Sequence, residues 1–429
     1  MIARPHPLLL LYRAAWRVAQ PFAPWFLRRR VAKGKEDAAR LAERRGIAGL
    51  ARPDGRLVWM HGASVGEALA ILPLVERVQA RGFHVLVTTG TVTSAQVMAQ
   101  RLPPGALHQY MPLDAAAYMR RFLGTWNPSL ILLAESELWP NLLLEARRRA
   151  IPVALVNARM SARSCQRWVR ARGLINALLS GVTLCLAQSR QDAQRLASLG
   201  AQNVAVTGNL KFDAAPLPAD AAALDALRQA IGHRPLWIAA STHDGEEAVA
   251  LAAHKAVAVI FPNFLTILAP RHAARGAAIA QLAAASRLPI TRRSQGGRIE
   301  ARTQIYLCDT IGELGLLYRL GAPVFLGRSL TASTALGGQN PIEPAKLGCA
   351  ILHGPHVSSF TEVYRLLDDA NGAVRVDNAE ALARELATLT ASPGARQSLA
   401  QRAAAAVNTQ AGAADATMRA LAPLLARAP

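Results

Sequence analysis

A carboxylate stands at the most informative turn in the chain, Glu67 in the segment HGASVGE (residues 61–67). The preceding residues 57–60 are apolar and bulky, as a buried strand requires, and Gly62 and Gly66 allow a tight turn. Apolar residues then recur at helical spacing, so we expect a helix to begin near Gly66. In its first turn, Glu67 would either cap free backbone N–H groups or serve as a general base at a strand end.

Two more acids and a lysine occupy similar positions further along the chain. Glu135 and Glu137, in AESELWPN (134–141), come directly after an apolar strand and before a helix with Pro140 in its first turn. Capping explains one such acid, whereas two acids at one strand end, beside a proposed base, favour a site. Lys211, in GNLKFD, follows the first domain's last expected strand, where a solvated surface charge is the ordinary interpretation.

The second half of the chain carries features of an anion or nucleotide site. Hydroxyl groups in STHDGEE (241–247) suit either a helix N-cap or a bound phosphate, and Arg271 follows a strand, where bidentate phosphate recognition would use it. Asn340 and Glu343, in GGQNPIE (337–343), lie one helical turn apart and could share one ligand, such as ribose hydroxyls. Neither GxxxxGK[ST] nor GxGxxG occurs, which argues against an ATPase or a dinucleotide enzyme.

Alternating strands and helices must position these residues, which predicts doubly wound parallel sheets. A proline-containing break at 212–220 divides the chain, so we expect two Rossmann-like α/β domains over 36–211 and 221–429, facing a central ligand cleft. The expected strands are 57–60, 85–88, 130–134, 153–157, 184–187, 236–240, 264–268, 305–308, 324–326 and 350–353.

Residues 1–35 form an arm of a different kind. Aromatic and aliphatic residues dominate as far as Leu27, and the basic run Arg28, Arg29 and Arg30 follows. This pattern is typical of a helix at a membrane interface, with arginines reaching the headgroups. An amphipathic helix packed on the first domain is the alternative, and a signal peptide is disfavoured because no small-residue cleavage site follows.

Composition limits the partners. The 49 Lys and Arg residues exceed the 28 Asp and Glu residues, giving a net charge of +21 that favours nucleic acid, anionic lipid or phosphorylated substrates. No uninterrupted run of eighteen apolar residues is present, which argues against an ordinary membrane-spanning helix. The four cysteines lack metal-ligand spacing and are expected to be reduced: Cys165, Cys185, Cys308 and Cys349.

Taken together, the motifs resemble those of the 3-deoxy-D-manno-octulosonic acid (Kdo) transferases of lipopolysaccharide assembly. The resemblance spans nearly the whole chain and rests on SVGE (64–67), ESELWPN (135–141), NARMSARS (157–164), GNLKFD (208–213), STHDGEE (241–247), APRH (269–272), DTIGEL (309–314) and GGQNPIE (337–343). It implies two domains of the glycosyltransferase B type and inverting, metal-independent transfer of Kdo from CMP-Kdo to a lipid A precursor. It also implies a location at the cytoplasmic face of the inner membrane, with contact to anionic lipid and none to nucleic acid.

The resemblance also implies roles for particular residues. Glu67 matches the catalytic base, while Glu135 and Lys211 match residues that steady the transition state. The CMP portion of the donor would be held by Pro270, Arg271, Ile311, Gly312, Glu313, Asn340, Pro341, Ile342 and Glu343. One departure is Arg328, which stands where the family usually has a second glycine, and residues 331–336 lengthen the loop that follows.

Two rival classes are retained at this point. A basic α/β protein that binds nucleic acid or membrane without catalysis would account for the charge and the arm. Only 5% of the residues are aromatic, however, which leaves few platforms for stacking bases. A transferase or epimerase acting on UDP-sugars would share the architecture.

Overall fold

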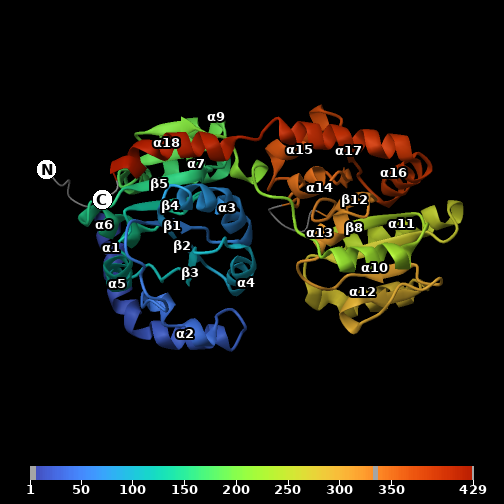
Figure 1. Ribbon diagram of the computed structural model, residues 1–429, viewed down its shortest axis with the longest axis horizontal. Coiled ribbons are helices and arrows are strands. Elements are labelled where there is room, and N and C mark those ends of the chain that lie inside the picture. The colour runs from blue at the N-terminus through green and yellow to red at the C-terminus, as the bar shows by residue number, and fades with distance from the viewer. Residues whose placement is uncertain (1–5, 332–336, 428–429) are drawn as a thin grey trace. The chain divides into compact units, whose positions relative to one another are not determined.

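The computed structural model describes residues 6–331 and 337–427, and the chain forms two compact units (Figure 1). The first unit contains residues 1–214 and 412–429, and the second contains residues 215–411. Each unit has a seven-stranded sheet, and all the strand pairs are parallel. These are the two doubly wound domains expected from the alternation of strands and helices.

The first sheet reverses its direction of growth between two central strands. Its order is β3-β2-β1-β4-β5-β6-β7, so the chain builds toward one edge from β1 and toward the other from β4. Open α/β sheets bind ligands at the carboxyl ends of the strands beside such a reversal. The strands are β1 (Leu57–His61), β2 (His84–Thr89), β3 (Leu107–Tyr110), β4 (Leu130–Ala134), β5 (Val153–Ala158), β6 (Leu184–Ala187) and β7 (Val204–Val206).

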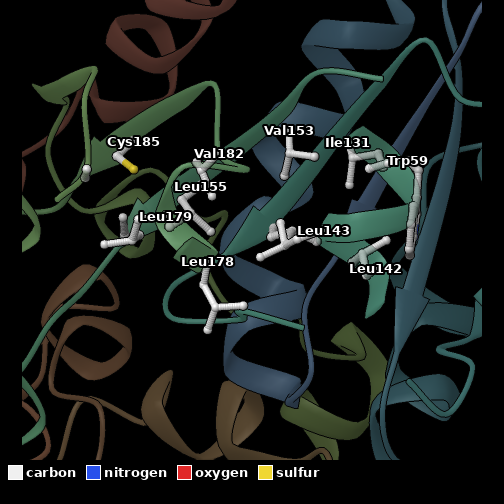
Figure 2. Packing of buried hydrophobic residues seen from close by; sticks show 14 of the residues in the cluster. Trp59, Ile131, Leu142, Leu143, Val153, Leu155, Leu178, Leu179, Val182 and Cys185 are labelled. Atoms are coloured by element: carbon white, nitrogen blue, oxygen red, sulfur yellow. The ribbon is translucent and has the colours of Figure 1, made fainter. Parts of the chain in front are cut away.

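Helices cover both faces of this sheet because its buried strands present apolar side chains to each side. Leu57 and Trp59 of β1 join one cluster, whereas Val58 and Met60 join the other. Figure 2 shows Trp59 and its neighbours in the first cluster. The helices of this unit are α1 (Pro7–Ala19), α2 (Ala23–Val31), α3 (Val65–Gln79), α4 (Val92–Arg101), α5 (Ala116–Trp126), α6 (Pro140–Arg148), α7 (Ala162–Val169), α8 (Arg172–Leu179), α9 (Arg190–Ser198) and α18 (Ala413–Arg427).

The second sheet repeats the design with the order β10-β11-β9-β8-β12-β13-β14, and its reversal lies between β8 and β12. Its strands are β8 (Leu236–Thr242), β9 (Leu265–Pro270), β10 (Ile290–Arg292), β11 (Ile305–Leu307), β12 (Pro323–Leu326), β13 (Ala350–His353) and β14 (Ala373–Arg375). Its helices are α10 (Ala221–Ile231), α11 (Glu246–Ile260), α12 (Gly276–Ala285), α13 (Leu314–Tyr318), α14 (Ile342–Lys346), α15 (Thr361–Asp369), α16 (Ala379–Ala391) and α17 (Pro393–Asn408).

The predicted C-terminal boundary is wrong. Helix α18 was expected in the 221–429 domain, but it belongs to the first unit, where Met418, Leu421 and Leu425 join the cluster beneath α3. Asp213 fixes the start of α18 by accepting hydrogen bonds from the backbone N–H groups of Gly412 and Ala414. The apolar face of α18 is evident in the sequence, but periodicity alone does not say which sheet that face covers.

The predicted linker at 212–220 contains the boundary between the units, which lies between Ala214 and Ala215. Its first residues, 212–214, belong to the first unit. Its later residues pack on the second unit, where Arg319 donates a 2.6 Å hydrogen bond to the carbonyl oxygen of Leu217. The segment that connects the units is therefore shorter than the nine residues, 212–220, that the prolines in the sequence suggested.

The N-terminal arm packs on the first unit through one face. Leu9 and Leu27 are buried, the Tyr12 hydroxyl donates to Asp114 over 3.0 Å, and Arg13 lies 3.2 Å from Glu145. Its other face exposes large apolar side chains: Leu8, Leu10, Leu11, Val18, Phe22, Trp25 and Phe26. Among the described residues, no helix has the length and apolar character needed to cross a membrane.

All ten strands expected from the sequence are present, within two residues at each end. Four strands of three or four residues were not predicted: β3, β7, β10 and β14. Each lies at an edge of its sheet, where one side of the strand has no neighbouring strand to bury it. The four cysteines are free thiols, as expected, although Cys165 is only half-buried.

Candidate functional site

Glu67 lies beside the reversal point of the first sheet, in the first turn of the helix that follows β1. Its carboxylate accepts a 2.9 Å hydrogen bond from the Ala63 N–H and a 2.8 Å bond from the Ser64 hydroxyl, while Ser64 caps the Glu67 N–H. Glu67 therefore binds a free backbone N–H group at the start of the helix, as the capping interpretation requires. Capping does not exclude basicity, because burial and the nearby Glu135 carboxylate raise the pKa of Glu67 despite these hydrogen bonds.

Glu135 and Lys211 form an ion pair in the same unit. The Lys211 Nζ lies 2.6 Å from the Glu135 Oε1, and both side chains are more than four-fifths buried. The interpretation of Lys211 as a solvated surface charge is therefore wrong. Glu135 follows β4 with a left-handed backbone (φ 54°), and the charge of Lys211 lowers the pKa that burial raises at Glu67.

The backbone around Lys211 is held by Asn157 of β5, the strand that pairs with β4. Asn157, in β5, accepts a 2.9 Å hydrogen bond from the Leu210 N–H, and Asn209 accepts a 3.0 Å bond from the Lys211 N–H. These bonds hold the short 3-10 turn Leu210–Phe212 over the carboxyl edge of the sheet. Residues 157, 209 and 211 thus come from two separate motifs that the fold brings together.

Glu137 is a third acid at this edge, and it does not cap helix α6. Asp114 has that function, because its carboxylate accepts 2.9 Å bonds from the N–H groups of Asn141 and Leu142. Burial and the charge of Glu67 raise the pKa of Glu137 to about 7. The Glu137 Oε2 lies 3.9 Å from the Nε2 of His61, whose own pKa is lowered to about 4 by burial, so this histidine is neutral at pH 7.

The sequence interpretation did not single out His61, Asp114 or Asn157. His61 ends β1 and could have been noticed as a polar residue in an apolar strand. Asp114 offered no signal, since it lies 26 residues before the helix it caps. Such long-range capping follows from tertiary structure alone.

The second unit has a polar reversal point between β8 and β12. Ser241, the next-to-last residue of β8, has a left-handed backbone (φ 55°), and the buried Glu246 begins the following helix. Glu246 accepts backbone hydrogen bonds from His243 and from three consecutive residues after β12: Arg328, Ser329 and Leu330. Glu246 thus connects the loops after β8 and β12, whereas the choice between capping and phosphate binding, which concerned the hydroxyl groups of this segment, stays a prediction.

Pro270 and Arg271 lie at the end of β9, next to β8. Pro270 is buried in the ladder opposite Thr242, and the Arg271 N–H donates to the Thr242 carbonyl oxygen over 3.0 Å. The Arg271 side chain is exposed. Arg271 therefore follows a strand at the carboxyl edge, as expected, and its contact with a ligand stays a prediction.

The predicted donor-binding residues in the turn after β11 differ in how available they are to a ligand. The Ile311 side chain is 77% exposed and Gly312 has a φ of 90°, so this turn presents an apolar side chain and open backbone. Glu313 is already paired: the Arg293 Nε lies 2.8 Å from both of its carboxylate oxygens. Burial raises the pKa of Glu313, but hydrogen bonds from Arg293 and Thr310 outweigh it and lower the pKa overall.

The turn before α14 is held by its own side chains. Asn340 Oδ1 accepts a 3.1 Å bond from the Ile342 N–H, and the side chains of Pro341 and Ile342 are buried. Glu343 is half-buried in the first turn of α14. Of the four residues predicted to bind CMP here, Pro341 and Ile342 can offer a ligand only their backbone. The lengthened loop predicted at 331–336 lies outside the described residues apart from Thr331.

Comparisons with known proteins agree with this arrangement. The family model of 3-deoxy-D-manno-octulosonic-acid transferase (kdotransferase) matches residues 39–214. A 3-deoxy-D-manno-octulosonic acid transferase from Haemophilus influenzae is 33% identical, covering 97% of this chain and 98% of that protein. One from Bordetella pertussis is 37% identical, covering 85% and 86% of the two chains. A glycosyltransferase structure from Rickettsia africae has a TM-score of 0.57 at 12% identity, covering 87% of this chain and 98% of that one.

The two Rossmann-like units and this structural likeness define an enzyme fold of the glycosyltransferase B type. At 12% identity the likeness establishes the fold alone. The sequence comparisons are more specific, and the chain belongs to the 3-deoxy-D-manno-octulosonic acid transferase family. This membership replaces the two rival interpretations, a non-catalytic basic protein and an enzyme acting on UDP-sugars.

Proposed function

We propose that the protein transfers Kdo from CMP-Kdo to the lipid A precursor lipid IVA, with inversion at the anomeric carbon, in lipopolysaccharide core biosynthesis. The observation that carries the proposal is the group of residues at the reversal point of the first sheet: Glu67, Glu135 and Lys211. Family membership supports the sugar, and the lipid acceptor is the one that the resemblance of the motifs implies.

Glu67 is proposed as the base. A sugar hydroxyl has a very high pKa, so its attack on an anomeric carbon requires a group that takes the proton as the bond forms. A raised pKa brings the carboxylate of Glu67 closer to the basicity that neutral pH favours. Its hydrogen bonds to Ala63 and Ser64 fix the carboxylate without neutralising it. Direct displacement by the acceptor hydroxyl needs no covalent intermediate on the enzyme.

Lys211 and Glu135 are proposed to stabilise charge during transfer. The anomeric centre becomes oxocarbenium-like as the leaving phosphate gains negative charge, so carboxylates suit the sugar and cations suit the anions. Glu135 serves the first purpose. Lys211 balances Glu135 and is also suited to hold the carboxylate of Kdo itself.

CMP is proposed to bind in the second unit. Arg271, with its exposed guanidinium, would contact the phosphate, and the turns at 311–313 and 340–343 would hold the nucleoside. Because Glu313 is bound by Arg293, we assign it the task of shaping its turn. No bound metal is proposed to take part in the reaction, since these cations and helix ends would stabilise the phosphate.

The arm is proposed to bring the enzyme to the cytoplasmic face of the inner membrane, where it meets its lipid acceptor. Its exposed apolar residues include Leu11, Val18, Phe22 and Trp25, and Arg28, Arg29 and Arg30 follow in α2. An apolar face bordered by arginines suits the interface of an anionic bilayer. Packing on the first unit and membrane contact are compatible, because they use different faces of the arm.

A direct assay of transfer tests the proposal. Purified protein, CMP-Kdo and a tetraacylated lipid A precursor should yield a Kdo-bearing lipid detectable by mass spectrometry, and CMP should raise the melting temperature more than UDP. Absence of the product together with a preference for UDP would contradict the proposed reaction.

A further inference from the structure

Arg328 has an unusual place in the second unit. It follows β12 at the reversal point beside β8, which is where an open α/β sheet of this order binds its ligand. Its backbone is left-handed (φ 58°), a conformation that favours glycine and is disfavoured for a long side chain.

The surrounding structure holds Arg328 in this conformation from several sides. Glu246, which is fully buried, accepts the Arg328 N–H over 2.6 Å. The Arg328 carbonyl oxygen accepts a hydrogen bond of 2.5 Å from the N–H of Gly338. At Gly327 a Cβ would come within 2.6 Å of the Ser241 carbonyl oxygen, so the chain enters the turn pressed against β8. The residue thus joins the loops after β8 and β12 to the turn that begins at Gly337.

The side chain of Arg328 lies in a positive environment and has an unsatisfied donor. Its Nε is buried and has no hydrogen-bond partner among residues 6–331 and 337–427. Burial lowers the pKa of the neighbouring His243, and the positive charges of Arg328 and Arg271 lower it further, against the opposing charge of Glu246. The two arginines follow the carboxyl ends of β9 and β12, and His243 follows the carboxyl end of β8. Buried donors and gathered cations of this kind are satisfied by an anion.

We propose that the guanidinium of Arg328 binds an anionic group of the nucleotide-sugar donor at the reversal point of the second sheet. The inference rests on the proposed function, and it adds to the predicted donor residues one that neither the resemblance nor its motifs assign. The bound group is the phosphate or the sugar carboxylate, both of which match the planar fork of arginine.

The test uses Arg328→Gly in the full-length protein. Glycine tolerates the left-handed backbone, so this substitution removes the guanidinium without adding strain, and the melting temperature should stay the same or rise. We expect the Kd for CMP or the KM for CMP-Kdo to increase roughly 10-fold or more, while the affinity for cytidine is unchanged. Arg328→Lys should recover part of the loss, because it restores the charge without the fork.

Two readouts separate the sources of the anion. Weaker CMP binding assigns the phosphate, whereas a higher KM for CMP-Kdo with unchanged CMP binding assigns the carboxylate. Arg302→Gly is the matched control, since Arg302 is exposed and precedes β11 at the opposite edge of the same sheet. It should leave both constants at their wild-type values.

Wild-type Kd and KM in Arg328→Gly would overturn this proposal alone. Equal losses for cytidine and CMP would also overturn it, because Arg328 would then only shape the pocket. A wild-type protein that neither binds CMP nor uses CMP-Kdo would overturn the proposed function together with this inference.

Discussion

The Lys211 Nζ lies 2.6 Å from the Glu135 Oε1, although the two residues are 76 positions apart in the chain. The pair lies at the carboxyl edge of the first sheet, where the strand that precedes Glu135 adjoins the strand that leads to Glu67. A lysine and two acids thereby meet at one reversal point. This meeting turns three separate motifs into one candidate centre for catalysis.

Replacing one member of the Glu135–Lys211 pair should destabilise the first unit more than replacing both members. In Lys211→Met or Glu135→Gln one buried group loses its partner, at a cost of about 3–5 kcal/mol for a fully buried pair and less here, where the side chains are 17% and 18% exposed. The double variant should recover part of this loss. Urea unfolding of the four proteins measures the coupling.

The Arg77–Asp415 pair provides the control for that cycle. Its side chains are 37% and 61% exposed, so Arg77→Met with Asp415→Asn should show a much smaller coupling, because solvent screens an exposed ion pair. A coupling free energy at Glu135–Lys211 no larger than that at Arg77–Asp415 would mean that the buried pair stabilises the first unit no more than an exposed pair does.

Glu137 should make the stability of the protein fall with rising pH. Its pKa is raised from an ordinary value of 4.5 to about 7 in the folded protein, so the folded state binds more protons than the unfolded state between these values. The free energy of unfolding therefore decreases as the pH rises through that window. Glu137→Gln removes this dependence. The melting temperature of the variant minus that of the wild type should therefore increase between pH 5 and about 8. Parallel melting curves for the two proteins across that range would show that Glu137 ionises normally.

The arm should bind vesicles through its exposed face alone. Deleting residues 1–35 would uncover the core around Leu9, so the cleaner variant combines Leu11→Ser, Val18→Ser, Phe22→Ser and Trp25→Ser. It should keep its melting temperature and lose co-sedimentation with vesicles containing anionic lipid. The control replaces Val259 and Ile260, which are also exposed but lie in the second unit. Equal loss of binding in both variants would assign the effect to general surface hydrophobicity.

Much of the fold and part of the site could be predicted from the sequence, for a physical reason. Central strands such as β4 are continuous apolar runs, and the residues directly after them must lie at the ligand-binding edge. Glu67 and Glu135 could be found in this way. The ion pair of Lys211 and the capping of α6 by Asp114 could not, because both join segments far apart in the chain. The domain to which α18 belongs could not be predicted for the same reason.

Arg271 should contribute to donor binding through its charge. Arg271→Ala should weaken the binding of CMP by about 1.5–3 kcal/mol and leave cytidine binding nearly unchanged, since only CMP carries the phosphate. Asn340→Ala should weaken CMP binding less, because its side chain already serves the Ile342 N–H and any bond to the ligand is neutral. Isothermal titration calorimetry measures both. Wild-type affinity in Arg271→Ala would move the phosphate to another part of the second unit.

The role of Glu67 is tested most directly by single-turnover transfer from CMP-Kdo in Glu67→Gln. Glutamine keeps an acceptor oxygen for the Ala63 N–H, and its amide group can donate to the Ser64 hydroxyl in place of the lost bond, so the free energy of unfolding should fall by only about 0.5–1.5 kcal/mol. The rate should fall by roughly 100-fold to 10,000-fold, with CMP affinity preserved. Because the pKa of Glu67 is raised, wild-type activity should decline as the pH falls while the carboxylate becomes protonated, and this limb should be absent from the residual activity of the variant.

The control for this measurement is Glu76→Gln, which makes the same change at an exposed position on the same helix and should leave the rate unaltered. The account predicts a stable Glu67→Gln protein that binds CMP and scarcely transfers Kdo. Near-normal transfer by that protein would contradict the account, and Glu135 would then have to be examined as the base.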